Sequence, residues 1–369
     1  MRKVARHRLV LLVWLMLFSG AASRIAADDG SRWLVSPELL EHAKLKVRWQ
    51  NDLPIGEKEN LEKLFILGDR VYALSDRNYM VSLNKATGSM VFGVSVAPAG
   101  FPILGLELYE GGLISVIGNK LVEIDPETGA ENKAKYLKYA VVCPAARNSS
   151  SFYVSGADRR LHILNADNKV PVFEVAADNE SLITSIIADE RSVIFATDAG
   201  NLISIMPDRP KRLWQFNATD AIAGPIVRDG MSLFFASEDT NVYRVDIIDL
   251  ISASLVWKYQ MPGVLENAPR VTQDVVYQYA RDKGLTAIDR QSGKFMWSLA
   301  QSTDLLAQAH GKAYVITRVR TLAVMDNTKG KKLYSVNFAG VSRYAANTTD
   351  SQIYIADERG RVACLEPIE

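Results

Sequence analysis

The sequence predicts an all-β fold, an eight-bladed β-propeller with four-stranded blades, and three observations lead to it. An apolar strand returns eight times at a spacing near 40 residues, which is the period of propeller blades. A polar turn and then an aromatic residue follow most of these strands. A strand near the N-terminus has no repeat of its own, and it can supply the outermost strand that the last repeat lacks. We expect the ring to be closed by pairing of this N-terminal strand with the last blade.

The first 27 residues predict a secretory signal peptide. Four basic residues lie within the first eight, the apolar run 9–18 follows, and small residues come next. A membrane span needs roughly 20 apolar residues, so this run is too short for an uncleaved anchor. No Cys lies near the cleavage region, so we expect no lipid anchor there. The sequence therefore predicts an exported protein, periplasmic or extracellular, with no transmembrane segment in the mature chain and a single propeller domain over 28–369.

Composition and charge exclude some classes of partner. The chain has 369 residues, of which 48% are hydrophobic and 23% charged, as in ordinary globular proteins. Without residues 1–22 there remain 39 Lys and Arg against 42 Asp and Glu. Nucleic-acid binding depends on concentrated positive charge, so nucleic acid is not the expected partner.

The segment before the repeats predicts a helix and a strand. Ser36 followed by Pro37 is typical of a helix start, with Ser as the cap, and we expect a short helix across one face of the ring. The strand Leu45–Asp52 follows, with Trp49 where the repeats carry their aromatic.

Each repeat contains a first apolar strand and a second, mostly alternating one. The first strands begin 42, 39, 41, 40, 42, 38 and 40 residues apart. They start at Val71, Leu113, Phe152, Val193, Leu233, Val275, Ala313 and Ile353. The second strand often ends in Asn or Asp and enters a turn that closes on Gly. Clear cases are Asn84–Gly88, Asp125–Gly129, Asp289–Gly293 and Asp326–Gly330. The acidic or amide side chain bonds the backbone N–H groups ahead of it, and Gly supplies the positive φ.

A third strand carries an aromatic, and a further, innermost strand completes each blade. The aromatics are Phe92, Trp214, Trp257, Trp297 and Tyr334. Proline precedes several innermost strands, at Pro102, Pro144, Pro225 and Pro269, where a missing N–H costs little. The last repeat stops at Glu369 after its third strand, so the strand with Trp49 is expected to complete it and to remove two exposed edges.

The segment Asp289-Arg-Gln-Ser-Gly293-Lys-Phe-Met-Trp297 resembles the D-x-x-T/S-G-K-x-x-W motif of PQQ-like propeller repeats. The resemblance extends over about residues 45–369 and includes the blade-motif residues Trp49, Asp125, Gly129, Trp214 and Trp257. The family contains quinoprotein dehydrogenases and the non-catalytic, BamB-type scaffolds of outer-membrane protein assembly. The fold is common to both, so the site must decide the function.

The resemblance to quinoprotein dehydrogenases implies PQQ, a calcium ion, a catalytic carboxylate and commonly an adjacent Cys pair. This sequence has no Cys-Cys pair, is shorter than such enzymes, and offers no carboxylate that a motif assigns to calcium. Its histidines share no metal-ligand spacing, and no nucleophile or phosphate-loop motif is present. Cys143 and Cys364 fall in distant repeats and are expected to be buried free thiols. We therefore predict no catalytic or metal-ligating residue and no cofactor.

Two segments are candidates for a partner surface. The loop 246–254 is longer and more apolar than its counterparts, and contains Ile247, Ile248, Leu250 and Ile251. The alternative is that its strands extend further and pack on a neighbouring blade. Arg318 and Arg320 stand where other blades have a short polar turn, and suit either a carboxylate partner or solvent.

The leading hypothesis is a monomeric, non-catalytic scaffold in the cell envelope that binds protein partners. Alternatives from other classes are a small oxidoreductase that uses PQQ and calcium, and an exported carbohydrate- or peptide-binding sensor.

Overall fold

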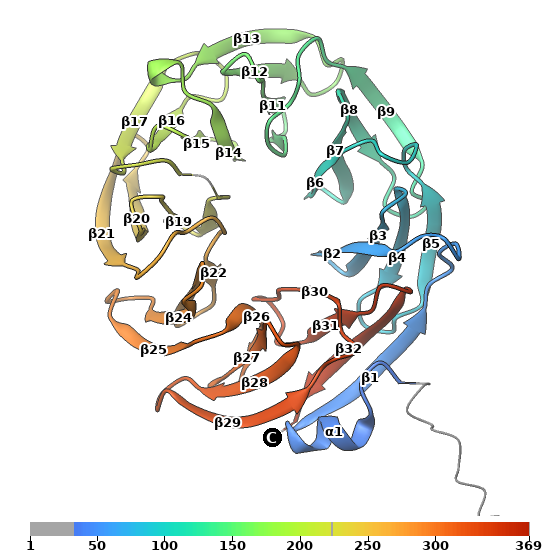
Figure 1. The fold of residues 1–369 in the computed structure, drawn as a ribbon. Coiled ribbons are helices and arrows are strands. Elements are labelled where there is room, and N and C mark those ends of the chain that lie inside the picture. The colour runs from blue at the N-terminus through green and yellow to red at the C-terminus, as the bar shows by residue number, and fades with distance from the viewer. Residues whose placement is uncertain (1–32, 223, 369) are drawn as a thin grey trace, which may run out of the picture.

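A computed structural model describes residues 33–222 and 224–368, which form a ring of eight four-stranded antiparallel sheets (Figure 1). We call the middle of this ring, which the innermost strands face, the central channel. The predicted fold class is confirmed. The predicted signal segment, 1–27, lies outside the described residues. None of the helices in the described part of the chain is long and apolar enough to cross a membrane.

Blades 1 to 4 follow the chain, and the strands of each blade run in order from the channel outward. Blade 1 consists of β2 (Leu61–Leu67), β3 (Arg70–Ser75), β4 (Tyr79–Asn84) and β5 (Met90–Ser95). Blade 2 consists of β6 (Ile103–Tyr109), β7 (Gly112–Ile117), β8 (Lys120–Ile124) and β9 (Glu131–Tyr136). Blade 3 consists of β10 (Ala146–Arg147), β11 (Ser151–Ser155), β12 (Arg160–Asn165) and β13 (Pro171–Ala176). After the 3-10 turn η2 (Asp178–Glu180), blade 4 consists of β14 (Ile183–Ala188), β15 (Val193–Thr197), β16 (Asn201–Ile205) and β17 (Arg212–Asn217).

Blades 5 to 8 complete the ring in the same order. Blade 5 consists of β18 (Val227–Asp229), β19 (Ser232–Ala236), β20 (Asn241–Asp249) and β21 (Ser252–Gln260). Blade 6 consists of β22 (Arg270–Val271), β23 (Val275–Ala280), β24 (Gly284–Asp289) and β25 (Phe295–Leu299). Blade 7 consists of β26 (Ser302–Ala309), β27 (Lys312–Thr317), β28 (Thr321–Asp326) and β29 (Lys331–Asn337). Blade 8 consists of β30 (Arg343–Ala345), β31 (Ile353–Ala356), β32 (Arg361–Pro367) and β1 (Leu45–Asp52).

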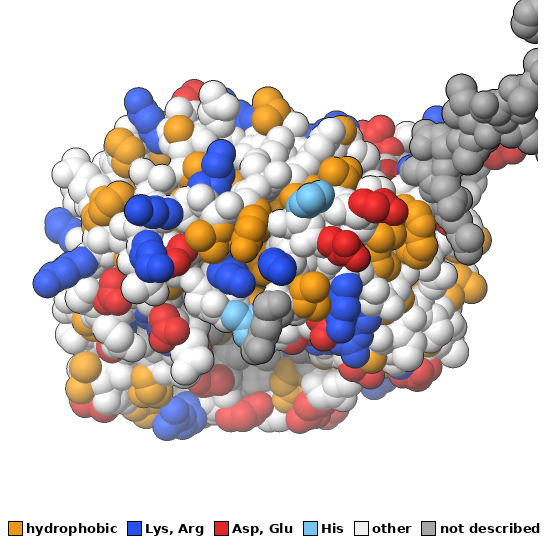
Figure 2. Space-filling view, turned by 90° about the horizontal axis from the view of Figure 1, so that it is seen from below, with side chains coloured by type: hydrophobic (Ala, Val, Ile, Leu, Met, Phe, Trp, Pro, Cys, Tyr) orange, Lys and Arg blue, Asp and Glu red, His pale blue; other side chains and the backbone are white. Residues whose placement is uncertain are grey.

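The second and third strands of each blade hold the core. Every residue of β11, β15 and β19 is buried, because neighbouring blades cover both faces of the sheet. Their sequences are accordingly almost continuous runs of β-branched, aromatic and small residues. The outermost strands keep one face toward solvent, and Figure 2 shows charged side chains of both signs among hydrophobic ones on one side of the rim.

The N-terminal strand closes the ring, as predicted. β1 pairs antiparallel with β32 from Leu45 opposite Pro367 to Asp52 opposite Arg361. It is therefore the outermost strand of blade 8, and Trp49 is 8% exposed.

The predicted helix is present as α1 (Pro37–His42), and the Ser36 side chain accepts a hydrogen bond from the Leu39 N–H. The expectation that it crosses one face of the ring is wrong, because it lies at the outer edge beside β29 and β1 (Figure 1). Its fully buried Leu40 joins a core cluster with Val336 and Phe338, and this apolar contact fixes the helix there.

In the blades that keep the sequence motif, the turn between the third and fourth strands is built by the acidic or amide residue and the glycine. In blade 6 the Ser292 N–H and hydroxyl both donate to Asp289 Oδ1, and these bonds lower the pKa of the Asp289 carboxyl. The Gly293 N–H donates to the Asp289 carbonyl at 2.9 Å, with Gly293 at φ +69°. The turn of blade 6 thus presents the backbone of Gly293, which has no side chain, to blade 5.

That glycine receives an aromatic ring from the preceding blade. A Cβ added at Gly293 would lie 2.6 Å from Trp257 Cγ, so only glycine allows the contact. Trp257 Nε1 also donates to the Arg290 carbonyl of the same turn at 2.9 Å. The same contact places Trp49 on Gly88, Phe92 on Gly129 and Trp297 on Gly330.

We expect Gly293→Ala to destabilise the ring more than Gly311→Ala. Both glycines have nearly the same φ, +69° and +70°, but a Cβ at Gly311 meets nothing within 4 Å. Left-handed strain should cost each variant about 1–2 kcal/mol, and the collision with Trp257 should add about 1–3 kcal/mol at Gly293. Urea unfolding followed by tryptophan fluorescence measures the difference. Equal losses would contradict the aromatic contact.

Candidate functional site

The central channel is lined by the innermost strands of all eight blades, and it contains two cavities. Blades 6, 7, 8 and 1 line a cavity of about 470 Å³, which we call the Arg270 cavity. Blades 2 to 5 line one of about 720 Å³, which we call the Glu107 cavity. Each blade contributes only a few residues, so either cavity exists only in the closed ring.

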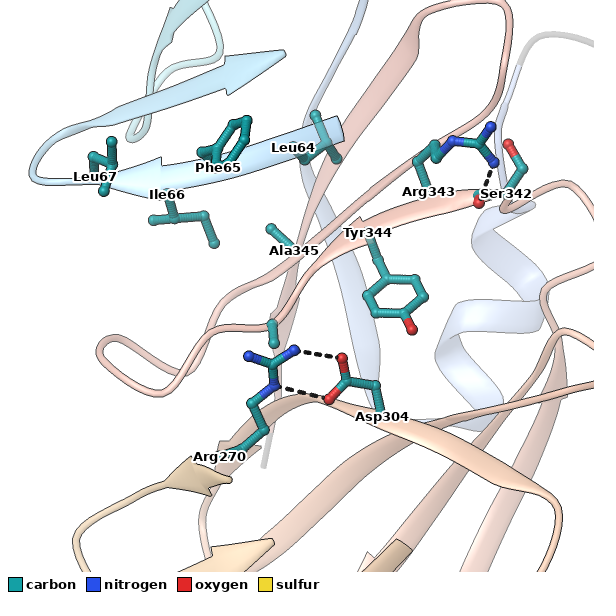
Figure 3. A pocket seen from close by; sticks show the side chains of 11 residues that line it. Leu64, Phe65, Ile66, Leu67, Arg270, Asp304, Ser342, Arg343, Tyr344 and Ala345 are labelled. Atoms are coloured by element: carbon teal, nitrogen blue, oxygen red, sulfur yellow. Dashed lines mark hydrogen bonds and ion pairs between the residues drawn. The ribbon is translucent and has the colours of Figure 1, made fainter. Parts of the chain in front are cut away.

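An ion pair dominates the Arg270 cavity (Figure 3). Arg270 donates from Nε and Nη2 to the two Asp304 carboxylate oxygens, at 2.9 and 2.8 Å. Burial lowers the pKa of Arg270, but the hydrogen bond and the charge of Asp304 raise it by more, so the pKa of Arg270 lies above its usual value. Phe65, Ile66 and Tyr344 complete the wall. The Arg270–Asp304 ion pair joins blade 6 to blade 7. Because the two charges neutralise each other, the pair presents little net charge to the cavity.

Charged side chains in the Glu107 cavity also pair across blades. Arg147 donates to Glu123 at 3.0 Å and lies over the Tyr109 ring, 4.8 Å from its centroid. Arg228 lies 2.7 Å from an Asp189 oxygen. These contacts join blade 2 to blade 3 and blade 4 to blade 5.

An ionic cluster replaces the aromatic contact between blades 2 and 3. Blade 2 has Lys133 where other blades carry their aromatic, and blade 3 has Lys169 where they carry the turn glycine. Lys169 keeps the left-handed backbone, with φ 56°, and its nearly buried ammonium pairs with Glu123, which also binds Arg147. Because no aromatic side chain of blade 2 packs against this turn of blade 3, the turn can carry the Lys169 side chain in place of glycine.

The apolar segment of blade 5 forms an extended hairpin. β20 and β21 are nine residues long each, and Ile247 is buried in one cluster with Trp214 of blade 4. Ile248, Leu250 and Ile251 remain 61%, 45% and 67% exposed. The strands do extend and pack on a neighbour, and their tip still presents apolar side chains to solvent.

Arg318 and Arg320 lie on the opposite face of the ring from this hairpin. Successive strands are antiparallel, so turns alternate between the two faces. We call the face with the β20–β21 turn the hairpin face, and the face with the blade-to-blade connections the linker face. Arg318 binds Asp282 at 2.7 Å, and Arg320 donates to the Ala339 carbonyl at 3.4 Å. The structure therefore separates the two predicted partner segments.

Comparison with known proteins agrees with this architecture. Residues 200–367 match the family model described as outer membrane protein assembly factor BamB. Among solved structures, the chain is similar to BamB from Moraxella catarrhalis, with 17% identity, a TM-score of 0.66, and coverage of 87% of this chain and 97% of that one. Both findings support the resemblance of this chain to PQQ-like propellers of the BamB type.

A second solved structure similar to this chain is the computationally designed Ika8 protein. The two share 14% identity with a TM-score of 0.65, over 85% of this chain and 98% of that one. No curated protein matches the propeller by sequence.

A calcium site of the kind that quinoprotein dehydrogenases use would need several converging oxygen ligands. Within 33–222 and 224–368, no group of three or more His, Cys, Asp or Glu side chains is placed to hold a metal ion. His162 instead stacks on Tyr139, with ring centroids 3.8 Å apart, and bonds Asp158. Cys143 and Cys364 are buried free thiols, as predicted, and burial raises the pKa of Cys143 to about 11.

Sequence reasoning missed Glu107, Arg147 and Lys169 of the propeller. A weak signal existed for Lys169, because its turn lacks glycine while the preceding blade lacks the aromatic. No signal marks Glu107, whose neighbours come from four separate repeats.

We expect Glu123→Gln to destabilise the propeller by about 2–4 kcal/mol. It would leave the Lys169 ammonium, 5% exposed, without its carboxylate, and unpaired buried charge is costly. Glu131→Gln is the matched control, because it breaks a more exposed pair with Lys120 and should cost less than about 1 kcal/mol. Chemical unfolding of both variants measures the contrast, and two equally small losses would contradict the role of the cluster.

Proposed function

We propose that this BamB-type propeller is exported and acts as a monomeric, non-catalytic protein-binding scaffold in the cell envelope, with the periplasm as its compartment. The family match and the similarity to BamB support the scaffold class. A signal-like segment at residues 1–27 supports export.

The observation that carries the proposal is the blade 5 hairpin. Its tip places Ile248, Leu250 and Ile251 in solvent, where large apolar side chains are costly unless a partner covers them. The contact of Ile247 with Trp214 holds the base of the hairpin, so the tip is presented on a rigid support. The neighbouring Met231 is 41% exposed and widens the apolar surface on the hairpin face.

Non-catalytic function is supported by how the polar groups of the channel are used. Arg270 and Asp304 satisfy each other, and Arg147 and Arg228 are likewise paired. An enzyme site normally brings a nucleophile or base together with an orienting partner and a stabiliser of developing charge. These channel groups instead form blade-to-blade pairs.

A photo-cross-linking residue at position 251 should capture an envelope protein, whereas the same residue at position 319 should not. Val319 is a matched control, since it is 69% exposed but lies on the linker face. Ile248→Asp with Ile251→Asp should weaken partner binding at least about tenfold, while stability changes by about 0.5 kcal/mol or less. Identical cross-links at both positions, or unchanged binding by the double variant, would remove the hairpin as the docking surface.

PQQ with calcium should leave the unfolding temperature of the purified chain unchanged. A ligand that binds the folded state at a hundred times its dissociation constant stabilises by about 2.7 kcal/mol, which a thermal scan detects readily. A rise of several degrees together with dye-linked alcohol oxidation would favour the oxidoreductase alternative.

A further inference from the structure

The Glu107 cavity has the size and lining of a small-molecule site. Its volume of about 720 Å³ falls in the range of ligand pockets. The wall is mainly apolar and includes Leu108, Ile114, Ile186, Ile187 and Ile226. A few charged groups converge on it from four blades, and their pairing determines which ligand it suits.

All the other charged groups that line the cavity are engaged. Arg147 pairs with Glu123, and Arg228 pairs with Asp189. Glu190 accepts hydrogen bonds from the Ser149 N–H, the Ser149 hydroxyl and the Tyr109 hydroxyl. Each of these charged groups therefore has a hydrogen-bond or ion-pair partner within the protein.

Glu107 is the exception among the described residues. No residue in 33–222 or 224–368 donates a hydrogen bond to it or forms an ion pair with it. Water reaches its carboxylate through the channel, but the surrounding wall removes much of the bulk solvent. This desolvation is the one cause that raises the pKa of Glu107 above its usual 4.5, and neither arginine of the cavity offsets it.

We infer that the Glu107 cavity binds an aliphatic primary amine, with its ammonium group on Glu107 and its hydrocarbon chain against the apolar wall. An anion would be repelled by the unpaired Glu107 carboxylate, and a neutral apolar ligand would desolvate this carboxylate without pairing it. An ammonium on an aliphatic chain satisfies both requirements. A free amine and the lysine side chain of a partner protein share this chemistry, and the inference stands independently of the proposed docking hairpin.

Calorimetric titration of the full chain with pentylamine tests the inference, with pentan-1-ol and pentanoate as comparisons of the same length. Pentylamine should bind at least about tenfold more tightly than either. Glu107→Gln should weaken pentylamine binding at least about tenfold, and the loss of a side chain without partners should leave the fold intact. Glu62→Gln is the control, because Glu62 is an exposed carboxylate of β2 outside this cavity, and should leave affinity within about twofold.

The pH dependence provides a second readout. Because its pKa is raised, Glu107 loses its charge at a higher pH than an ordinary glutamate as the solution is acidified. Asp189 and Glu190, the other carboxylates of the cavity, have lowered pKa values and stay ionised there. The remaining charged groups that face the cavity are Arg147 and Arg228. Pentylamine affinity should therefore fall as pH drops through the Glu107 pKa, and Glu107→Gln should remove that fall.

A further arm with Nα-acetyl-lysine methylamide distinguishes the two sources of the amine. Binding of both probes would indicate that a lysine of a partner protein is admitted, and binding of pentylamine alone would indicate a free amine. The inference is overturned if pentylamine does not bind at millimolar concentration, if pentan-1-ol binds equally well, or if Glu107→Gln binds pentylamine as tightly as the unmodified chain.

Discussion

The ring depends on one repeated contact, in which an aromatic side chain of an outermost strand lies on the left-handed glycine of the next blade. Trp257 on Gly293 shows its parts most clearly. The acidic residue shapes the turn, glycine removes the Cβ that would block approach, and the indole N–H satisfies a turn carbonyl. Blades 1 and 6 receive an aromatic side chain from the blade before and offer one to the blade after, so the motif joins neighbouring blades as well as shaping the turn.

The junctions that abandon this contact are where the molecule acquires its distinctive surfaces. Between blades 2 and 3 the Lys169, Glu123 and Arg147 cluster takes over, and Arg147 also lines the Glu107 cavity. Between blades 4 and 5, Trp214 packs with Ile247 of a lengthened hairpin. Between blades 7 and 8 the chain ends replace the turn, and Leu40 of α1 fills the space. Where the repeat motif is missing, other contacts thus hold neighbouring blades together and form additional surfaces, and the ring stays closed.

The sequence was sufficient to predict the blades and their closure because these follow from local periodicity. A strand spacing near 40 residues, the turns ending at Gly88 or Gly293, and the orphan strand with Trp49 are all visible in linear order. The position of α1 could not be predicted in this way, because it depends on which buried cluster Leu40 packs into. The cavity of Glu107 was also invisible, because residues separated by whole repeats meet only in the closed ring.

The meeting of the two ends in blade 8 has a consequence for how the chain is threaded. The Ile368 N–H donates to the Lys44 carbonyl at 2.8 Å, so the two ends of the propeller body abut. Every blade contacts its two neighbours, but within blade 8 the last strand and the first strand of the chain are joined by hydrogen bonds and not by a peptide bond. The position of the chain ends therefore decides which blade is numbered first. A circularly permuted gene that joined these ends and opened another exposed turn would encode the same set of contacts.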